Sequence, residues 1–414
     1  MTHKDFSEYR EYVASLFNLI WLEQAGTHRL RKIWRRTDEL AKIEVASLGF
    51  FIEQLYGQHK KWLTDTARAI RNQTQTAHGL IFEIVTLGSL AARGMNIQPM
   101  KKNHPAYDAE VTGQDGNLLR VSIKNHDLSM HEARFRFDSK RLANVVRRRV
   151  LASDGAWQAV IRSRTHLDAQ AFEEIAGILR RSPIRPGELA PHLFPKRGAS
   201  IQLRRLLHSI YRPGSYTCNV NCPQAAQEQT RFISNIDKAI QAFNKHSQRG
   251  RGHSNVIFMR VHGSADIEGL RRYAQEAISK PECSVDLIMF YQSIIGHNRT
   301  KQAITYYACD VVSPRYTGPN FKFPLQFISG EVVTRPLGRT LVDIASSGQL
   351  PVDDITGEYS YQQGHLFYRQ NADRTFNNPP YVSAGLKETF VVEQPYGNVH
   401  IHRAFLEDED LFLL

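Results

Sequence analysis

The sequence predicts an α/β fold, and three patterns along its 414 residues support this. Apolar residues recur at helical spacing over residues 1–72, and the first proline is Pro99. Two buried-type strands with a helix between them, over residues 255–291, are typical of a sheet covered on both faces. From about residue 322 onward the chain is strand-like and rich in turns.

These patterns divide the chain into three expected regions. Residues 1–74 form a helical N-terminal region, residues 75–320 an α/β core, and residues 321–414 a β-rich C-terminal region. Within the core, residues from about 150 to 250 are interrupted by several prolines and read as a basic helical insertion.

The composition is that of a soluble globular protein, with 42% hydrophobic and 23% charged residues. No run approaches the roughly 18 apolar residues of a membrane span, and no signal peptide is recognisable, so we expect a cytoplasmic protein. Four cysteines are too few for a disulfide framework. Cys218 and Cys222 could supply half of a zinc site, but buried free thiols are the favoured interpretation.

The net charge of +12 is concentrated in one third of the chain. Residues 120–250 contain 23 Lys and Arg against 10 Asp and Glu, a net of +13, whereas the remainder has 30 basic and 31 acidic residues. A polyphosphate backbone is the natural partner of such a segment. A solvated basic face is the alternative.

The clearest local signals lie between residues 76 and 126. Thr76 and Gly94 are a suitable N-cap and C-terminal glycine for a helix over 76–93. A short strand over 95–100 follows, and then a hairpin whose strands cover 107–112 and 118–126 around a Gly-Gln-Asp-Gly-Asn turn.

The hairpin brings an acid and a lysine together. Ser122 and Lys124 are two residues apart and share a strand face. A turn centred on Asp115 pairs Asp108 with Ser122, and a turn centred on Gly116 pairs Asp108 with Lys124. Either register places Asp108 beside the lysine. The alternative interpretation of this pair is a surface ion pair between strands.

Such a group suits phosphodiester hydrolysis, which needs a cation, an activated water and stabilisation of the leaving oxygen. Mg²⁺ accepts one or two carboxylates and a backbone carbonyl while keeping several waters. A neighbouring lysine can position the water and offset the charge that develops.

In order and in residue types, this segment resembles the PD-(D/E)xK, or restriction endonuclease-like, nuclease superfamily. The resemblance implies an αβββαβ core, completed by the strand near 255–261, with Glu83, Asp108, Ser122 and Lys124 at the active site. It also implies that Glu83, Asp108 and the carbonyl of Ile123 bind Mg²⁺ or Mn²⁺. Ser122 departs from the family pattern, which has an acid there, and Glu83 or Glu110 could compensate.

We further expect the nucleic acid to contact a set of basic residues close to the motif: His78, Arg134, Arg136, Lys140, Arg147, Arg148 and Arg149. Gly-rich nucleotide-binding loops are absent from the sequence.

The sequence therefore predicts a Mg²⁺-dependent endonuclease, with DNA favoured over RNA and with restriction or anti-phage defence as the role suggested by analogy. One alternative is a catalytically degenerate nuclease fold that only binds nucleic acid. A second is an RNA- or tRNA-cleaving toxin. A third is a structural subunit whose basic region meets an acidic partner protein, and a homodimer is also compatible with the sequence.

Overall fold

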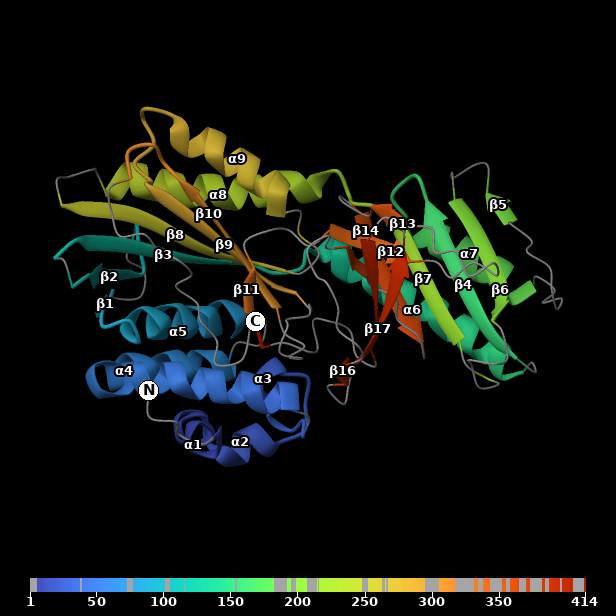
Figure 1. Cartoon of the computed structure of the whole chain (residues 1–414), viewed down its shortest axis with the longest axis horizontal. Coiled ribbons are helices and arrows are strands. Elements are labelled where there is room, and N and C mark those ends of the chain that lie inside the picture. The colour runs from blue at the N-terminus through green and yellow to red at the C-terminus, as the bar shows by residue number, and fades with distance from the viewer. Residues whose placement is uncertain are drawn as a thin grey trace. The chain divides into compact units, whose positions relative to one another are not determined.

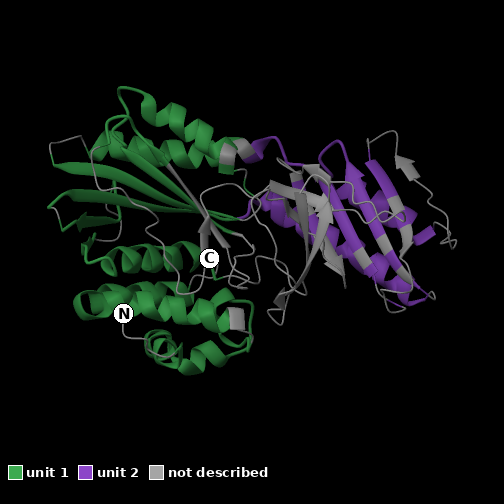
Figure 2. Ribbon diagram, viewed as in Figure 1, with its two compact units in different colours: residues 1–127, 229–336, 408–414 green, residues 128–228, 337–407 purple. Residues whose placement is uncertain are grey.

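The computed structural model divides the chain into two compact units, which Figure 2 colours separately. The first comprises residues 1–127, 229–336 and 408–414, and the second comprises residues 128–228 and 337–407. The structure describes residues 6–37, 39–72, 77–100, 105–114, 116–152, 155–181, 192–194, 199–206, 214, 216–247, 252–262, 265, 267–294, 305–316, 331–333, 338–342, 352–354, 358–364, 370–372, 382–383, 387–394, 397–404 and 413–414.

The N-terminal region is helical, as predicted. It contains α1 (Phe6–Phe17), α2 (Leu19–Glu23), α3 (Arg29–Trp34) and the long α4 (Glu39–Asn72). Helices α1 and α4 pack so closely that a Cβ atom at Gly49 would lie 1.9 Å from the carbonyl oxygen of Tyr9. Glycine is therefore the residue that this helix crossing requires.

Helix α5 (Ala77–Ala91) joins the helical region to the sheet. On one side it packs against α4, where a Cβ at Gly88 would lie 2.6 Å from the Cβ of Phe51. The helix is followed by Gly94 with φ of +76°, and Met95 donates a backbone hydrogen bond of 3.3 Å to Leu90. The predicted C-terminal glycine is confirmed, because this left-handed conformation favours glycine. Thr76 lies outside the described residues.

A seven-stranded mixed sheet forms the centre of the first unit, in the order β1-β2-β3-β8-β9-β10-β11. Strands β1, β2 and β3 form an antiparallel meander, β8 and β9 run parallel to β3, and β10 is antiparallel to β9. The strands are β1 (Asn96–Pro99), β2 (Ala109–Thr112), β3 (Leu118–His126), β8 (His253–Val261), β9 (Leu287–Ile294), β10 (Thr305–Val312) and β11 (Glu331–Val333).

Helices cover both faces of this sheet, as the apolar strands predicted (Figure 1). Helix α5 lies on one face, where Phe82 stacks on Tyr291 of β9 with ring centroids 5.7 Å apart. Helices α8 (Gln227–His246) and α9 (Ile267–Ser279) lie on the other face. There Phe232 of α8 stacks on His126 of β3.

The second unit corrects the prediction of a basic helical insertion, because strands make up much of it. Residues 128–228 do contain α6 (Met130–Leu151) and α7 (Ala169–Arg181), but they also contain strands. These are β4 (Ala156–Ser163), β5 (His192–Phe194), β6 (Ala199–Leu206) and β7 (Tyr216–Pro223). Together with β14 (Glu358–Gly364) they form a sheet in the order β14-β7-β4-β6-β5.

The C-terminal region is rich in strands, as predicted, and most of them belong to a third sheet. Its order is β13-β12-β15-β18-β17-β16, and most of its pairing is between β17 and β18. The strands are β12 (Gly338–Val342), β13 (Val352–Asp354), β15 (Gln370–Ala372), β16 (Val382–Ser383), β17 (Lys387–Gln394) and β18 (Gly397–Ala404). Near the C-terminus, the amide of Leu413 donates to the buried Glu44 carboxylate.

Cys218, Cys222 and Cys283 are buried and form no disulfide. Cys218 and Cys222 both lie on β7, where four residues of extended chain span about 13 Å, too far for one shared ion. Burial raises the pKa of the Cys218 thiol to about 12. The interpretation as buried free thiols is confirmed for this pair. Among the described helices, none is both long enough and apolar enough to cross a membrane.

Candidate active site

The carboxylate of Asp108 is the meeting point of the predicted motif. Its Oδ2 atom accepts a hydrogen bond of 2.6 Å from the backbone amide of Ile123. The hydroxyl of Ser122 and the ammonium of Lys124 each lie 3.4 Å from the same oxygen. The side chains of Asp108 and Lys124 are 33% and 39% exposed, so solvent and solutes reach this pair.

The register of the hairpin explains this convergence. Ala109 pairs with Val121, which puts Asp108 opposite Ser122. Of the two registers considered from the sequence, the structure has the first. The backbone amide of Asp108 still donates a hydrogen bond to the carbonyl of Val121. The amide of Ile123 then donates to the Asp108 side chain, where a regular ladder would offer a backbone carbonyl.

The carbonyl of Ile123 points to the same edge of β3 as its amide, because a residue in an antiparallel ladder presents both groups to one neighbour. That neighbour is the Asp108 carboxylate, at the residue just before β2 begins. A carboxylate and a backbone carbonyl on one strand edge are hard oxygen donors of the kind that Mg²⁺ prefers. This donor set fits the ion that the family resemblance implies.

Glu83 is half-buried on α5, and the helix geometry indicates its level along the sheet. A Cβ at Gly79 would lie 3.3 Å from the Cβ of Asn125, so this stripe of α5 faces β3. Helix α5 runs antiparallel to β3, and one turn onward covers about 6 Å, or two strand residues. Glu83 therefore reaches the level of Ile123, and its direct participation in the site remains a prediction.

Ser122 stands where the family pattern has an acid, and Glu110 is one of the residues that could compensate. Both have partners within the protein. Ser122 is fully buried and its hydroxyl lies against Asp108, so it supports the carboxylate. Glu110 accepts a hydrogen bond of 2.8 Å from Tyr107 and lies 3.7 Å from Arg120. These contacts give Glu110 partners within the protein, and its compensation for the missing acid stays a prediction.

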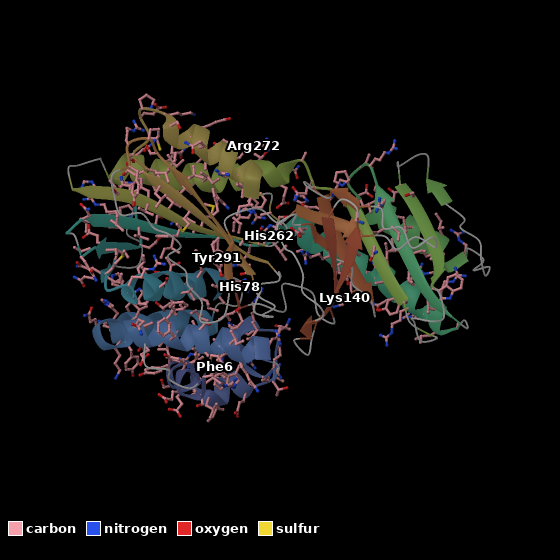
Figure 3. All side chains as sticks on the ribbon, viewed as in Figure 1. Phe6, His78, Lys140, His262, Arg272 and Tyr291 are labelled. Carbon is pink, nitrogen blue, oxygen red and sulfur yellow. The ribbon has the colours of Figure 1, made fainter. Side chains whose placement is uncertain are left out.

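A second polar cluster occupies the carboxyl ends of β3 and β8. Arg260, only 5% exposed, donates to Asn125 at 2.8 Å and to Asp127 at 2.7 Å. His78, in the first turn of α5 (Figure 3), lies 3.1 Å from the same Asp127 carboxylate. The structure thus gives His78, predicted to contact phosphate, a carboxylate partner within the protein.

Burial sets the protonation states in this cluster. It lowers the pKa of His78 to about 4, against a smaller opposing effect of the Asp127 hydrogen bond. Burial alone would raise the pKa of Asp127. The His78 hydrogen bond and the Arg260 charge outweigh it and hold that pKa well below its usual range. At neutral pH, Asp127 is charged and His78 is neutral.

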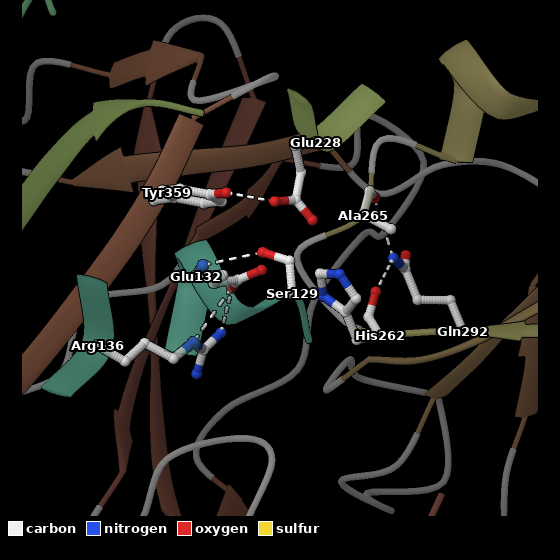
Figure 4. A network of polar contacts seen from close by, with 8 residues as sticks. All are labelled: Ser129, Glu132, Arg136, Glu228, His262, Ala265, Gln292 and Tyr359. Carbon is white, nitrogen blue, oxygen red and sulfur yellow. Dashed lines mark hydrogen bonds and ion pairs between the residues drawn. The ribbon is translucent and has the colours of Figure 1, made fainter. Parts of the chain in front are cut away.

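The predicted nucleic-acid contacts on α6 fall into two groups. Arg136 is 12% exposed and binds the buried Glu132 at 2.8 Å (Figure 4), while Arg149 donates to the carbonyl of Leu179. Arg134 is bonded to Asp138 at 2.7 Å but stays 59% exposed, with its guanidinium 5.5 Å from the ring of Phe137. Exposed positions are held by Lys140, Arg147 and Arg148.

A third group of potential ligands was not assembled by the sequence. The imidazole rings of His126 and His262 lie 6.0 Å apart between centroids and are nearly parallel, at 25°. His126 is the last residue of β3, two positions after Lys124. His262 lies far from it in the sequence, and only the parallel pairing of β3 with β8 brings the two histidines together.

Comparisons with known proteins add no relative. No protein-family model matches the chain, and no curated protein or solved structure is detectably similar to it.

Proposed function

We propose that the chain is a metal-dependent nuclease whose active site is built around Asp108 and Lys124. The observation that carries the proposal is the single carboxylate oxygen of Asp108 that meets the Ile123 amide and the Lys124 ammonium at the edge of β3. The pairing of β2 with β3 stops at Ala109 and Val121, whereas β3 continues beyond Val121. The site at this edge of β3 is partly exposed.

The topology supports the same proposal. A helix followed by a three-stranded meander and then by strands parallel to the third is the arrangement expected of a restriction endonuclease-like core. Helix α5, the meander β1-β2-β3 and the strands β8 and β9 follow this order. Strand β2 is antiparallel to both of its neighbours.

Each residue has a defined task in this proposal. Asp108, the Ile123 carbonyl and Glu83 would hold Mg²⁺ or Mn²⁺, which would supply charge neutralisation at the phosphate and an acidified water. Lys124 would orient an attacking water by hydrogen bonding and would place a positive charge beside the phosphate oxygens. The buried Ser122 hydroxyl helps to hold the Asp108 carboxylate in place.

The exposed face of α6 supports nucleic acid as the substrate class. Phe137 is 57% exposed beneath the guanidinium of Arg134, and exposed aromatic rings beside cations can stack on bases. Lys140, Arg147 and Arg148 add exposed positive charge along the same helix (Figure 3 labels Lys140). We propose DNA as the favoured polymer.

The test is a cleavage assay with the full chain on single- and double-stranded DNA and on RNA, with Mg²⁺, Mn²⁺ or a chelator. We expect metal-dependent cleavage that Lys124→Ala and Asp108→Asn each reduce by roughly 10²-fold or more. Lys61→Ala, an exposed lysine on α4, is the control and should cleave like the wild type.

Two outcomes would change the proposal. If the wild type binds DNA but cleaves no polymer with either metal, the chain is a degenerate, binding member of this fold. If it cleaves only RNA, the chemistry stands and the substrate class changes.

A further inference from the structure

A basic pocket opens among the N-terminal helices, entirely within the first compact unit. Its volume is about 730 Å³, which is within the range of pockets that hold small molecules and cofactors. The lining comes from the helices α1 to α4 and from the turn between α3 and α4. None of the described residues that line the pocket belongs to the proposed nuclease site.

Positive charge dominates this lining. Arg10 comes from α1 and Lys42 from the start of α4. Between these helices, Arg35 and Arg36 follow the end of α3. The described lining thus has four basic side chains and one acid, Glu23 at the end of α2, which is a net formal charge of +3. Cations that converge from three places in the chain repel one another unless an anion lies between them.

These charges are not neutralised by the protein itself. Among the residues that the structure describes, no carboxylate forms an ion pair with Arg10, Arg35 or Lys42. Arg10 is half-buried, and burial lowers the pKa of its guanidinium without an opposing effect from an acid. A guanidinium stays charged at physiological pH, so a half-buried one without a carboxylate favours an anion from solution.

Trp34 holds the Arg10 guanidinium in place. The guanidinium carbon lies 4.0 Å from the centroid of the Trp34 ring, and one of its nitrogens donates to the Trp34 carbonyl at 3.5 Å. A guanidinium has five N–H donors in a rigid plane, so these contacts fix its orientation and leave donors for a ligand. Such preorganisation reduces the entropy that is lost on binding.

The lining also contains an aromatic ring and a carboxylate that an isolated phosphate would not use. Phe6 lies one helical turn before Arg10 on α1, as the label in Figure 3 helps to locate, and is 38% exposed. An exposed ring beside a cation can stack on a nucleobase. The carboxylate of Glu23 only accepts hydrogen bonds, so it suits the hydroxyls of a ribose and repels phosphate.

We propose that this pocket binds a nucleoside di- or triphosphate. In this assignment the phosphates contact Arg10, Arg35 and Lys42. The ribose hydroxyls donate to Glu23, and the base lies against Phe6. A concave pocket of this size suits a small molecule better than a nucleic-acid duplex, whose phosphates lie on a convex surface. The proposal does not depend on nuclease activity.

The test is isothermal titration calorimetry of the full chain with ATP, GTP and inorganic tripolyphosphate. EDTA is present throughout, so that no Mg²⁺ carries the phosphates to the proposed metal site at Asp108. We expect one nucleotide per chain, bound at least 10-fold more tightly than tripolyphosphate, because the base and the ribose add contacts. Binding should raise the melting temperature and weaken as the salt concentration rises.

Variants of the cations test where the nucleotide binds. Arg35→Ala and Lys42→Ala each remove an exposed cation and should weaken ATP binding by roughly 10-fold. Arg10→Gln should weaken it by at least as much, but it also loses its contact with Trp34, so the exposed variants serve if it fails to fold. Lys61→Ala, an exposed lysine further along α4, is the matched control and should bind ATP like the wild type.

Glu23→Ala distinguishes a nucleotide from a simple anion. It should weaken ATP binding by about 5-fold, because the ribose loses an acceptor. It should strengthen the binding of tripolyphosphate, because a negative charge is removed from the pocket. If Glu23→Ala strengthens the binding of both ligands, the pocket recognises no ribose and the nucleotide proposal is wrong.

Three further results would overturn the proposal. The first is that neither nucleotide binds at concentrations up to the millimolar range. The second is that tripolyphosphate binds as tightly as ATP and GTP. The third is that Arg35→Ala and Lys42→Ala bind ATP as tightly as Lys61→Ala does, which would place the nucleotide elsewhere on the chain.

Discussion

The backbone amide of Ile123 donates a 2.6 Å hydrogen bond to the side chain of Asp108, in the position where a strand backbone would otherwise accept it. The Asp108 side chain therefore has a structural task as well as its proposed chemical one. The two tasks are separable, because an asparagine side chain keeps an accepting oxygen and loses the charge.

We therefore expect Asp108→Asn to abolish cleavage while leaving stability nearly unchanged. Asp108→Ala should also abolish cleavage and lower the free energy of unfolding by about 1–2 kcal/mol, because the Ile123 amide loses its acceptor. Urea unfolding of both variants measures the difference. Equal destabilisation by the two substitutions would mean that this hydrogen bond does not stabilise the hairpin.

Two glycines of α4 make a matched pair for the packing of α1. Gly49→Ala should lower the free energy of unfolding by about 3 kcal/mol or more, since its Cβ would overlap the Tyr9 carbonyl, 1.9 Å away. Gly57→Ala, where no atom lies within 4 Å, should raise it by up to about 1 kcal/mol through helix propensity. Thermal unfolding of the two variants measures whether each substitution lowers or raises the stability of the fold.

His78 should make stability depend on pH. Its pKa is about 4 in the folded chain and about 6.5 when unfolded, so between these values only the unfolded state takes up the proton. This contribution is absent above pH 6.5 and destabilises the fold by roughly 1–2 kcal/mol at pH 5.

We expect the free energy of unfolding to fall between pH 7 and pH 5 by less in His78→Asn than in the wild type. His131→Asn, an exposed histidine on α6, is the control and should follow the wild type. Parallel losses in all three proteins would show that His78 is not protonated on unfolding in this range.

Arg147 and Arg148 should contribute to the salt dependence of DNA binding. Removing two phosphate contacts makes the slope of log K against log salt shallower by about 1.8 for duplex DNA. The double variant Arg147→Ala with Arg148→Ala should show this change in fluorescence anisotropy at several salt concentrations. Lys60→Ala with Lys61→Ala in α4 is the matched control. An unchanged slope in the arginine variant would mean that these two arginines form a solvated basic face and do not contact DNA.

The first 126 residues were predictable because their signals are local. Gly94 marks the left-handed turn that follows α5. The Asp-Gly turn limits the hairpin to two registers, which place Asp108 opposite either Ser122 or Lys124. The same reasoning could not position Glu83, since its level along β3 depends on how Gly79 packs against Asn125. That contact belongs to helix packing and leaves no periodic trace in the sequence.

The strands of residues 128–228 were missed for a different reason. Strand β7 does show period-2 alternation, with Tyr216, Cys218, Val220 and Cys222 apolar and polar residues between them, but the prediction did not use this short pattern. Its partners are distant, since β7 pairs with β4 and with β14, which begins at Glu358. Pairing between such distant segments is not visible in a local pattern.

The pairing of β3 with β8 also has a consequence for biosynthesis. Leu118 pairs with His253, about 135 residues later, and at 5–20 residues per second a ribosome needs on the order of 10 s to supply β8. During that interval one edge of β3 has no strand beside it, and the nascent chain exposes a template for non-native pairing. Protection of that edge by a chaperone, or by slow translation of the intervening segment, would therefore decide the yield of folded protein in a cell.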